Sequence, residues 1–175
     1  YMLSLLNEEL LVKLRAAGMY QLTAQVESGL PKTLKYMNKP LDLNHARKIV
    51  KAANRLGMIM NSNLIIGFWN ETREDIEESI RNAESLRLDG IGYLTPIPMI
   101  GTSLRSDYLR EGLIDEKTPV EELEIPVKSL TMTSKEINHM HQQANQNHRG
   151  IRLRQLFSPA GIFYEFLPKI FSQSE

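Results

Sequence analysis

Residues 58–75 read MIMNSNLIIGFWNETRED, and this stretch decides the fold. The apolar run from Met58 to Ile66 stops at Gly67, which predicts a buried strand. Shortly afterwards Thr72 and Asp75 form a capping-box pattern, with Asp in place of the usual Glu or Gln, and this predicts the start of a helix. A strand followed closely by a capped helix is the repeating unit of a parallel α/β sheet.

The same unit recurs on both sides of this stretch. We predict further strands at Met19–Val26 and Gly90–Thr95, so the spacing between strands is that of βαβ units. Apolar residues at helical spacing, with Asp42 and Ser134 as expected caps, predict helices over 10–17, 30–37, 43–56, 73–86, 104–110 and 134–148. The sequence therefore predicts an α/β fold with three parallel strands.

Composition excludes several classes of protein. The 175 residues contain 21 basic and 21 acidic side chains, and this balance indicates neither a nucleic-acid nor a membrane-surface partner. No apolar run has the length of a membrane span, and the first residues lack the pattern of a signal peptide, so we expect a cytoplasmic protein. The absence of cysteine excludes disulfides and thiolate metal sites within these residues.

Polar residues interrupt two of the predicted strands. Thr23, Gln25 and Glu27 alternate along the first strand, so they are expected to share one face, and Asn61 and Asn63 do the same on the second. Such groups are costly to bury without partners. They indicate either a polar ligand pocket at the carboxyl ends of the strands, or a self-satisfied buried network, or strands that are partly open to solvent.

Short motifs after each strand, taken in order, resemble those of the radical S-adenosylmethionine (SAM) superfamily. They are most similar to the branch that often carries a cobalamin-binding domain upstream. The matching pieces are Ala17-Gly18, Glu27-Ser28-Gly29, Lys39, Gly67-Phe68, Glu71-Thr72, Pro96, Pro98 and Gly101-Thr102. The resemblance implies that residues 1–110 form strands four to six of a partial barrel, a parallel βαβαβ half-barrel. Residues 111–175 would be a helical C-terminal extension.

The resemblance also implies a chemistry. In this family a CxxxCxxC loop on the first strand binds a 4Fe–4S cluster, and reductive cleavage of SAM gives a 5′-deoxyadenosyl radical. Cobalamin-linked members commonly transfer methyl groups. This chain would supply SAM-binding wall residues and no catalytic or metal-binding side chain, because the cluster cysteines, and any cobalamin site, would lie outside it. By resemblance the cofactor-binding positions are Gln25, Glu27, Ser28, Asn63, Ile65, Gly67, Tyr93 and Pro96.

The resemblance implies partners as well. The chain would pack against the N-terminal half of a parent protein and contact an unidentified substrate. The exposed barrel edge would favour self-association. Departures from the family motif at Asn63, Trp69 and Asn70 support an alternative, a degenerate SAM-independent binding module without catalytic activity. Half of an ordinary (β/α)8 enzyme is a third interpretation.

Several other residues receive structural interpretations. Glu71 is expected near the start of a helix, and Trp69 is expected to pack in its loop. His139 and His141 point away from one another on a helix and do not form a metal pair. The basic group Arg47, Lys48, Lys51 and Arg55 is expected to be the solvated face of a helix rather than a phosphate site. The tail from Arg149 to Arg154 is expected to pack back on the barrel rather than to form a lid, a membrane-surface piece or a partner contact.

Overall fold

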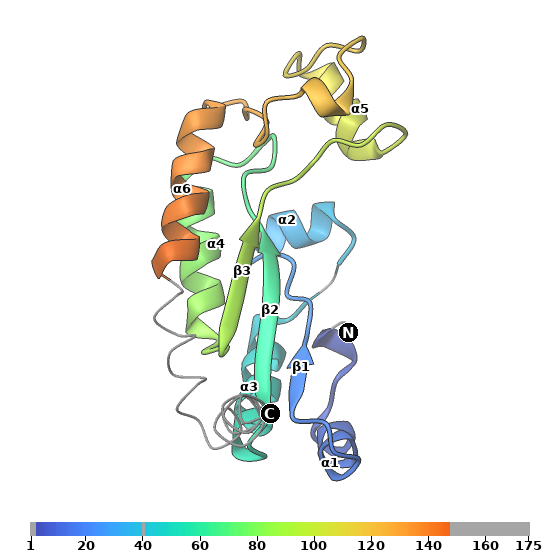
Figure 1. Cartoon of the computed structure of the whole chain (residues 1–175), viewed down its shortest axis with the longest axis vertical. Helices are drawn as coiled ribbons and strands as arrows, with labels where there is room; N and C mark the ends of the chain where they lie inside the picture. The colour runs from blue at the N-terminus through green and yellow to red at the C-terminus, as the bar shows by residue number, and fades with distance from the viewer. Residues whose placement is uncertain (1–2, 40, 148–175) are drawn as a thin grey trace, which may run out of the picture.

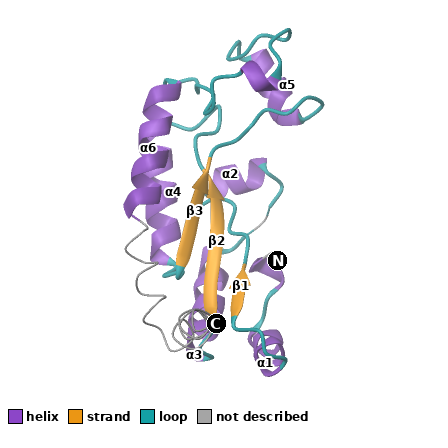
Figure 2. Ribbon diagram, in the orientation of Figure 1, coloured by secondary structure: helices purple, strands orange, loops and turns teal. Residues whose placement is uncertain are grey.

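The computed structural model describes residues 3–39 and 41–147 of the chain, and the predicted tail contact of Arg149–Arg154 lies outside them. Helices and strands alternate as the sequence predicts (Figures 1 and 2). In order, the elements are η1 Leu3–Leu5, α1 Glu8–Ala16, β1 Gln21–Thr23, α2 Pro31–Tyr36, α3 Leu43–Arg55, β2 Ile59–Ile65, α4 Arg73–Ser85, β3 Gly90–Leu94, α5 Ser103–Arg110, η2 Val120–Glu122 and α6 Ser134–Asn147.

The three strands form one parallel sheet in the order β1-β2-β3. Gln21 pairs with Ile59 where β1 and β2 begin, and Asn63 pairs with Gly92 where β2 meets β3. Helix α3 connects β1 to β2 and helix α4 connects β2 to β3 (Figure 1). This confirms the α/β class and the parallel βαβαβ arrangement.

Only one face of the sheet is covered by helices within the described residues. The strand residues on that face are buried in one core with Ile49 and Val50 of α3 and with Ile76 and Ala83 of α4. These strand residues are Leu22, Met60, Leu64, Ile91 and Tyr93, joined by Ala24 and Val26 just after β1. On the opposite face Ile59, at the start of β2, is buried, and the other strand residues are exposed or half-buried. The sheet is therefore one-sided in this part of the chain, although strands of a parallel sheet are ordinarily covered on both faces.

Local capping explains why most helices begin where they do. The side chains of Asn7, Asp42 and Thr72 accept backbone N–H groups at the starts of α1, α3 and α4, and Thr72 forms the predicted reciprocal capping box with Asp75. The predicted cap of the last helix was wrong by one residue. Thr133 and Glu136, rather than Ser134, exchange the capping hydrogen bonds at α6.

A β-bulge interrupts the pairing of β1 with β2. Thr23 pairs with Asn61, whereas Glu27 pairs with Leu64. The segment from Thr23 to Glu27 is therefore one residue longer than the segment of β2 that it faces. The Ser62 hydroxyl occupies the gap and accepts the Val26 N–H at 3.0 Å. Glu27 then has a left-handed backbone, φ 67°, which re-aims its side chain relative to a regular strand.

The segment after β3 is held by buried polar contacts. Arg105 of α5 is 6% exposed, and its guanidinium donates to the carbonyl oxygens of Pro98 and Thr118. Helix α6 then runs beside β3 and α4 (Figure 1). None of the helices in the described part of the chain combines the length and the apolar character that crossing a membrane requires.

Candidate functional site

The uncovered face of the sheet is polar and hollowed near its middle. A hollow of about 350 Å³ is lined there by Thr23, Asn61, Asn63, Gly90 and Gly92, among others. Gly90 and Gly92 are alternate residues of β3, so their missing side chains leave this space open. At Gly92 an added Cβ would lie 2.6 Å from the Asn63 Oδ1 atom, so this glycine makes room for the Asn63 carboxamide.

Farther along the same face lie three of the predicted cofactor positions. Gln25 and Asn63 are exposed and Ile65 is half-buried. Two uncharged carboxamides beside an apolar side chain can hydrogen-bond hydroxyl or amino groups and pack against a flat ring. This part of the prediction is therefore chemically compatible with SAM.

Glu27 is already engaged in an ion pair. Its carboxylate lies 3.3 Å from the Lys39 ammonium nitrogen, and the two side chains are 17% and 39% exposed. The sequence had placed both residues in the family motif but had not paired them. Partial exposure leaves the Glu27 carboxylate able to accept further hydrogen bonds.

The Ser28 side chain makes its contacts in the protein interior. It is fully buried, its hydroxyl accepts the Leu30 N–H at 3.1 Å, and it lies 3.4 Å from the Ser79 hydroxyl of α4. The Ser79 hydroxyl also accepts the Gly29 N–H at 2.9 Å, and a Cβ on Gly29 would meet the Ser79 backbone at 2.1 Å. The Ser28-Gly29 pair thus lets α4 approach the loop after β1 closely.

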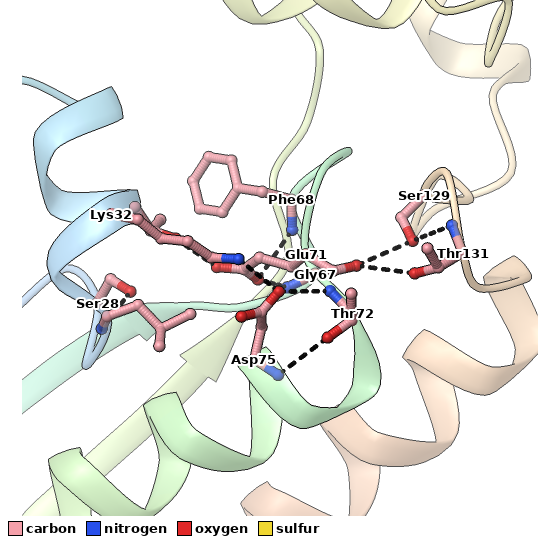
Figure 3. Close-up of polar contacts among 11 residues, drawn as sticks. Ser28, Lys32, Gly67, Phe68, Glu71, Thr72, Asp75, Ser129 and Thr131 are labelled. Atoms are coloured by element: carbon pink, nitrogen blue, oxygen red, sulfur yellow. Dashed lines mark hydrogen bonds and ion pairs between the residues drawn. The ribbon is translucent and has the colours of Figure 1, made fainter.

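Glu71 organises the loop after β2 (Figure 3). Its buried carboxylate accepts the N–H groups of Gly67 and Phe68, at 2.8 and 3.1 Å, and the Thr33 hydroxyl at 2.7 Å. Burial raises the pKa of this carboxyl group, and the hydrogen bonds oppose that rise. Glu71 precedes the helix cap, as expected, but its carboxylate stabilises the loop through these hydrogen bonds.

The Glu71 backbone ties the loop to the C-terminal segment. Its carbonyl oxygen accepts the Ser129 and Thr131 hydroxyl groups at 3.2 and 3.3 Å (Figure 3). Gly67 has φ +86°, and a Cβ there would lie 2.6 Å from the Ile137 Cγ2 atom of α6. The glycine therefore permits a close approach by α6, whereas the sequence had assigned that approach to a ligand.

Helix α6 also forms hydrogen bonds with the backbone of Tyr93. The Asn145 carboxamide binds both the N–H and the carbonyl oxygen of Tyr93, and His141 Nε2 lies 2.7 Å from the same oxygen. Pro96, the last predicted position, is buried in the loop after β3. The eight predicted positions thus divide into a group on the open face and a group that supports the fold.

An aromatic cluster closes the carboxyl end of the sheet. The ring of Trp69 lies 6.5 Å from that of Tyr36 and under the Arg110 guanidinium at 5.6 Å, so Trp69 packs in its loop as predicted. The Tyr36 hydroxyl donates to Asp107 at 2.6 Å. Burial and this hydrogen bond raise the pKa of Tyr36 to about 12.

The chain's own residues do not fit an iron–sulfur cluster. The sequence has no cysteine, and within residues 3–39 and 41–147 no three His, Asp or Glu side chains gather as metal ligands. His141 instead contacts Tyr93. A cluster would need thiolates supplied from outside this chain.

The fold is that of a known barrel enzyme. It aligns with coproporphyrinogen III oxidase (HemN) from Escherichia coli, a radical SAM enzyme, with a TM-score of 0.58 and 15% identity over 81% of this chain and 29% of that protein. The observed fold therefore agrees with the fold that the ordered sequence motifs imply. The chain shares its fold with a radical SAM enzyme.

Two curated proteins are similar to this chain in sequence. Cytidylyl-2-hydroxyethylphosphonate methyltransferase of Streptomyces wedmorensis is 31% identical over 63% of the chain and 22% of that protein. The tRNA-2-methylthio-N(6)-dimethylallyladenosine synthase of Rickettsia canadensis is 26% identical over 79% of the chain and 29% of that protein. The chain therefore spans less than a third of these relatives. No family model matches it.

Several residues that shape this candidate site were not predicted from the sequence. Ile137, His141 and Asn145 come from α6, far along the chain from the strands that they contact. Their helix was predicted, but nothing in its sequence says which strand it covers. Gly90 and Gly92 could have been found, because alternate glycines in a strand mark a place where another group approaches closely.

Proposed function

We propose that this chain supplies the C-terminal wall of a SAM-binding cavity in a larger radical SAM enzyme. The observation that carries the proposal is the one-sided sheet, whose open face presents Gln25, Asn63 and Ile65 together. Gln25 and Asn63 would bind the polar groups of SAM, Ile65 would contact its adenine, and Glu27 would accept from its ribose. SAM, when bound beside a reduced cluster, supplies a carbon radical or a methyl group.

The cluster ligands would come from an N-terminal partner segment. Such a segment would cover the open face and exclude water from the polar hollow beneath Asn63. The similarity to a methyltransferase favours methyl transfer as the reaction subtype, and cobalamin remains a candidate cofactor outside this chain. We place the assembled protein in the cytoplasm, where reduced thiolate ligands are maintained.

The test reconstitutes the chain with the cysteine-bearing segment encoded in its parent reading frame. After anaerobic cluster assembly, SAM affinity is measured by calorimetry and 5′-deoxyadenosine formation by chromatography. Gln25→Ala and Asn63→Ala should each weaken SAM binding about tenfold, the effect of losing one good hydrogen-bonded contact. Gln21→Ala is the matched control, because Gln21 is exposed at the opposite end of β1. Equal SAM affinities in all four proteins would refute the assignment.

A degenerate binding module is the second candidate function. It is favoured by α6, which hydrogen-bonds to the Tyr93 backbone and covers Gly67 through Ile137, because both positions were expected to bind the cofactor. A reconstituted protein that holds its cluster but binds no SAM would support this module over the enzyme.

Self-association is a further proposal about the isolated chain. β1 is a terminal strand of the described sheet, and Leu5 and Val12 beside it are 72% and 52% exposed. An apolar surface next to a sheet edge favours pairing with a second copy. Sedimentation velocity should show dimers or larger species, which Val12→Lys should reduce, whereas a monomer at all concentrations would contradict the proposal.

A further inference from the structure

The helix-covered side of the molecule carries a basic hollow away from the open face. It has a volume of about 640 Å³ and lies between the second half of α3 and the end of α4. Four cations line it, Arg47, Lys51, Arg55 and Arg87, and no carboxylate is among its lining residues. Because the whole chain has zero net charge, this grouping is a local departure from the average surface.

The cations in this hollow are poorly neutralised. Arg55 lies 3.5 Å from Glu8, but both side chains are more than half exposed, so solvent screens the pair. Lys51 and Arg87 have no ion-pair partner within the described residues. The charge of the hollow is therefore available to a ligand.

One of the cations is also held in place. The Arg47 guanidinium donates to Asn44 Oδ1 at 2.9 Å and to the Ser85 hydroxyl at 3.1 Å. The Ser85 contact bridges α3 and α4, and the two contacts together leave other N–H groups of the guanidinium able to donate. A preorganised guanidinium loses less entropy on binding an anion than a mobile one.

Helix dipoles explain only part of this arrangement. Arg55 ends α3 and Arg87 follows the end of α4, where cations are favourable. Arg47, however, lies two turns before the end of α3, and Lys51 lies directly before the last turn, so the dipole gives little reason for their charge. The apolar side chains of Val50 and Leu86, both almost fully buried, form the floor beneath the cations.

We propose that this hollow binds a phosphate-bearing anion. Guanidinium and ammonium donors converge from two helices, as phosphate oxygens require. The site is independent of SAM and lies beyond the proposed function, and the sequence had assigned its α3 cations to a solvated helix face.

The experiment titrates the 175-residue chain with inorganic pyrophosphate and follows backbone amide chemical shifts. Shifts should concentrate at Arg47, Lys51, Ser85 and Arg87. The double variant Lys51→Gln/Arg87→Gly should weaken binding at least about tenfold. Glycine suits position 87 because its φ is 57°, so the charge is removed without backbone strain.

Lys48→Gln is the matched control for general attraction. Lys48 is exposed on the same helix but does not line the hollow. Its variant should bind pyrophosphate within about twofold of the original chain, since one exposed charge that does not line the hollow contributes little in salt. Diffuse shifts over the surface, or an equal loss in Lys48→Gln, would overturn the proposal.

A second arm identifies the source of the phosphate. A short uridine RNA is added to the pyrophosphate complex. If the RNA displaces pyrophosphate from the same amides, the site takes the phosphodiester backbone, and if it does not, the site takes a free oligophosphate group. Failure of SAM binding in the reconstituted enzyme leaves either result unchanged, so the two proposals are tested separately.

Discussion

The side-chain carboxamide of Asn145 binds both backbone polar groups of Tyr93. The Tyr93 N–H donates to Asn145 Oδ1 at 3.1 Å, and Asn145 Nδ2 donates to the Tyr93 carbonyl oxygen at 3.0 Å. This is the pattern that a neighbouring strand would provide, although it comes from helix α6. At this position α6 thus satisfies the outer edge of β3 and protects it from pairing with another strand.

Replacing Asn145 with alanine should expose this edge. The Tyr93 N–H would lose its partner, while the carbonyl oxygen would keep the His141 contact, so we expect a loss of about 1–3 kcal/mol in the free energy of unfolding. Urea denaturation and hydrogen exchange of the Tyr93 amide measure the effect. Asn138→Ala, the same substitution at a half-buried position of α6, is the control, and equal amide protection in both variants would contradict the interpretation.

The hydrogen bonds of the Glu71 carboxylate lead to a second prediction. Glu71→Ala leaves the buried N–H groups of Gly67 and Phe68 without an acceptor, and we expect a loss of about 3 kcal/mol in urea denaturation. Glu71→Gln should cost much less, because its oxygen can accept both N–H groups and its amide can donate to the Thr33 hydroxyl. Similar losses for the two variants would show that the carboxylate charge, rather than its geometry, holds the loop.

The raised pKa of Glu71 predicts a pH dependence of stability. Burial favours the protonated carboxyl, so the folded state holds its proton to higher pH than the unfolded chain. The contribution is full below the unfolded pKa of about 4.5 and is lost as pH rises through the folded pKa. The stability of the original chain minus that of Glu71→Gln should therefore fall as pH rises above about 4.5, in parallel urea titrations. A difference that grows over this range would reverse the sign and refute the assignment.

Features encoded within a few residues were predictable from the sequence. The Thr72–Asp75 capping box and the buried face of Leu22, Ala24 and Val26 result from local chemistry and strand alternation. The three parallel strands and their intervening helices arise from the same patterns. The cap at Thr133 was missed because Ser134 beside it is an equally good capping residue by type.

Features that join distant segments were not predictable in the same way. Asn145 is simply a polar residue on a predicted helix, and only the packing of α6 on β3 reveals its contact with Tyr93. The ion pair of Glu27 with Lys39 was likewise not predicted, because it depends on the bulge opposite Ser62 and on the left-handed backbone at Glu27. A one-residue insertion in a strand redirects the side chains beyond it, and alternation alone cannot detect such an insertion.

The close contact between Gly67 and Ile137 leads to the last prediction. An added Cβ at Gly67 would lie 2.6 Å from Ile137 Cγ2, and φ at Gly67 is +86°. Gly67→Ala should therefore cost the strain of a left-handed alanine, about 1–2 kcal/mol, and in addition the cost of displacing α6. Gly57→Ala separates the two costs, since Gly57 has φ +68° and no atom within 4 Å of an added Cβ. In the Ile137→Ala background, whose own cavity costs about 2–5 kcal/mol, Gly67→Ala should cost no more than Gly57→Ala does. Urea denaturation of the four proteins of this double-mutant cycle gives the coupling energy, and additive losses would show that α6 does not press on Gly67.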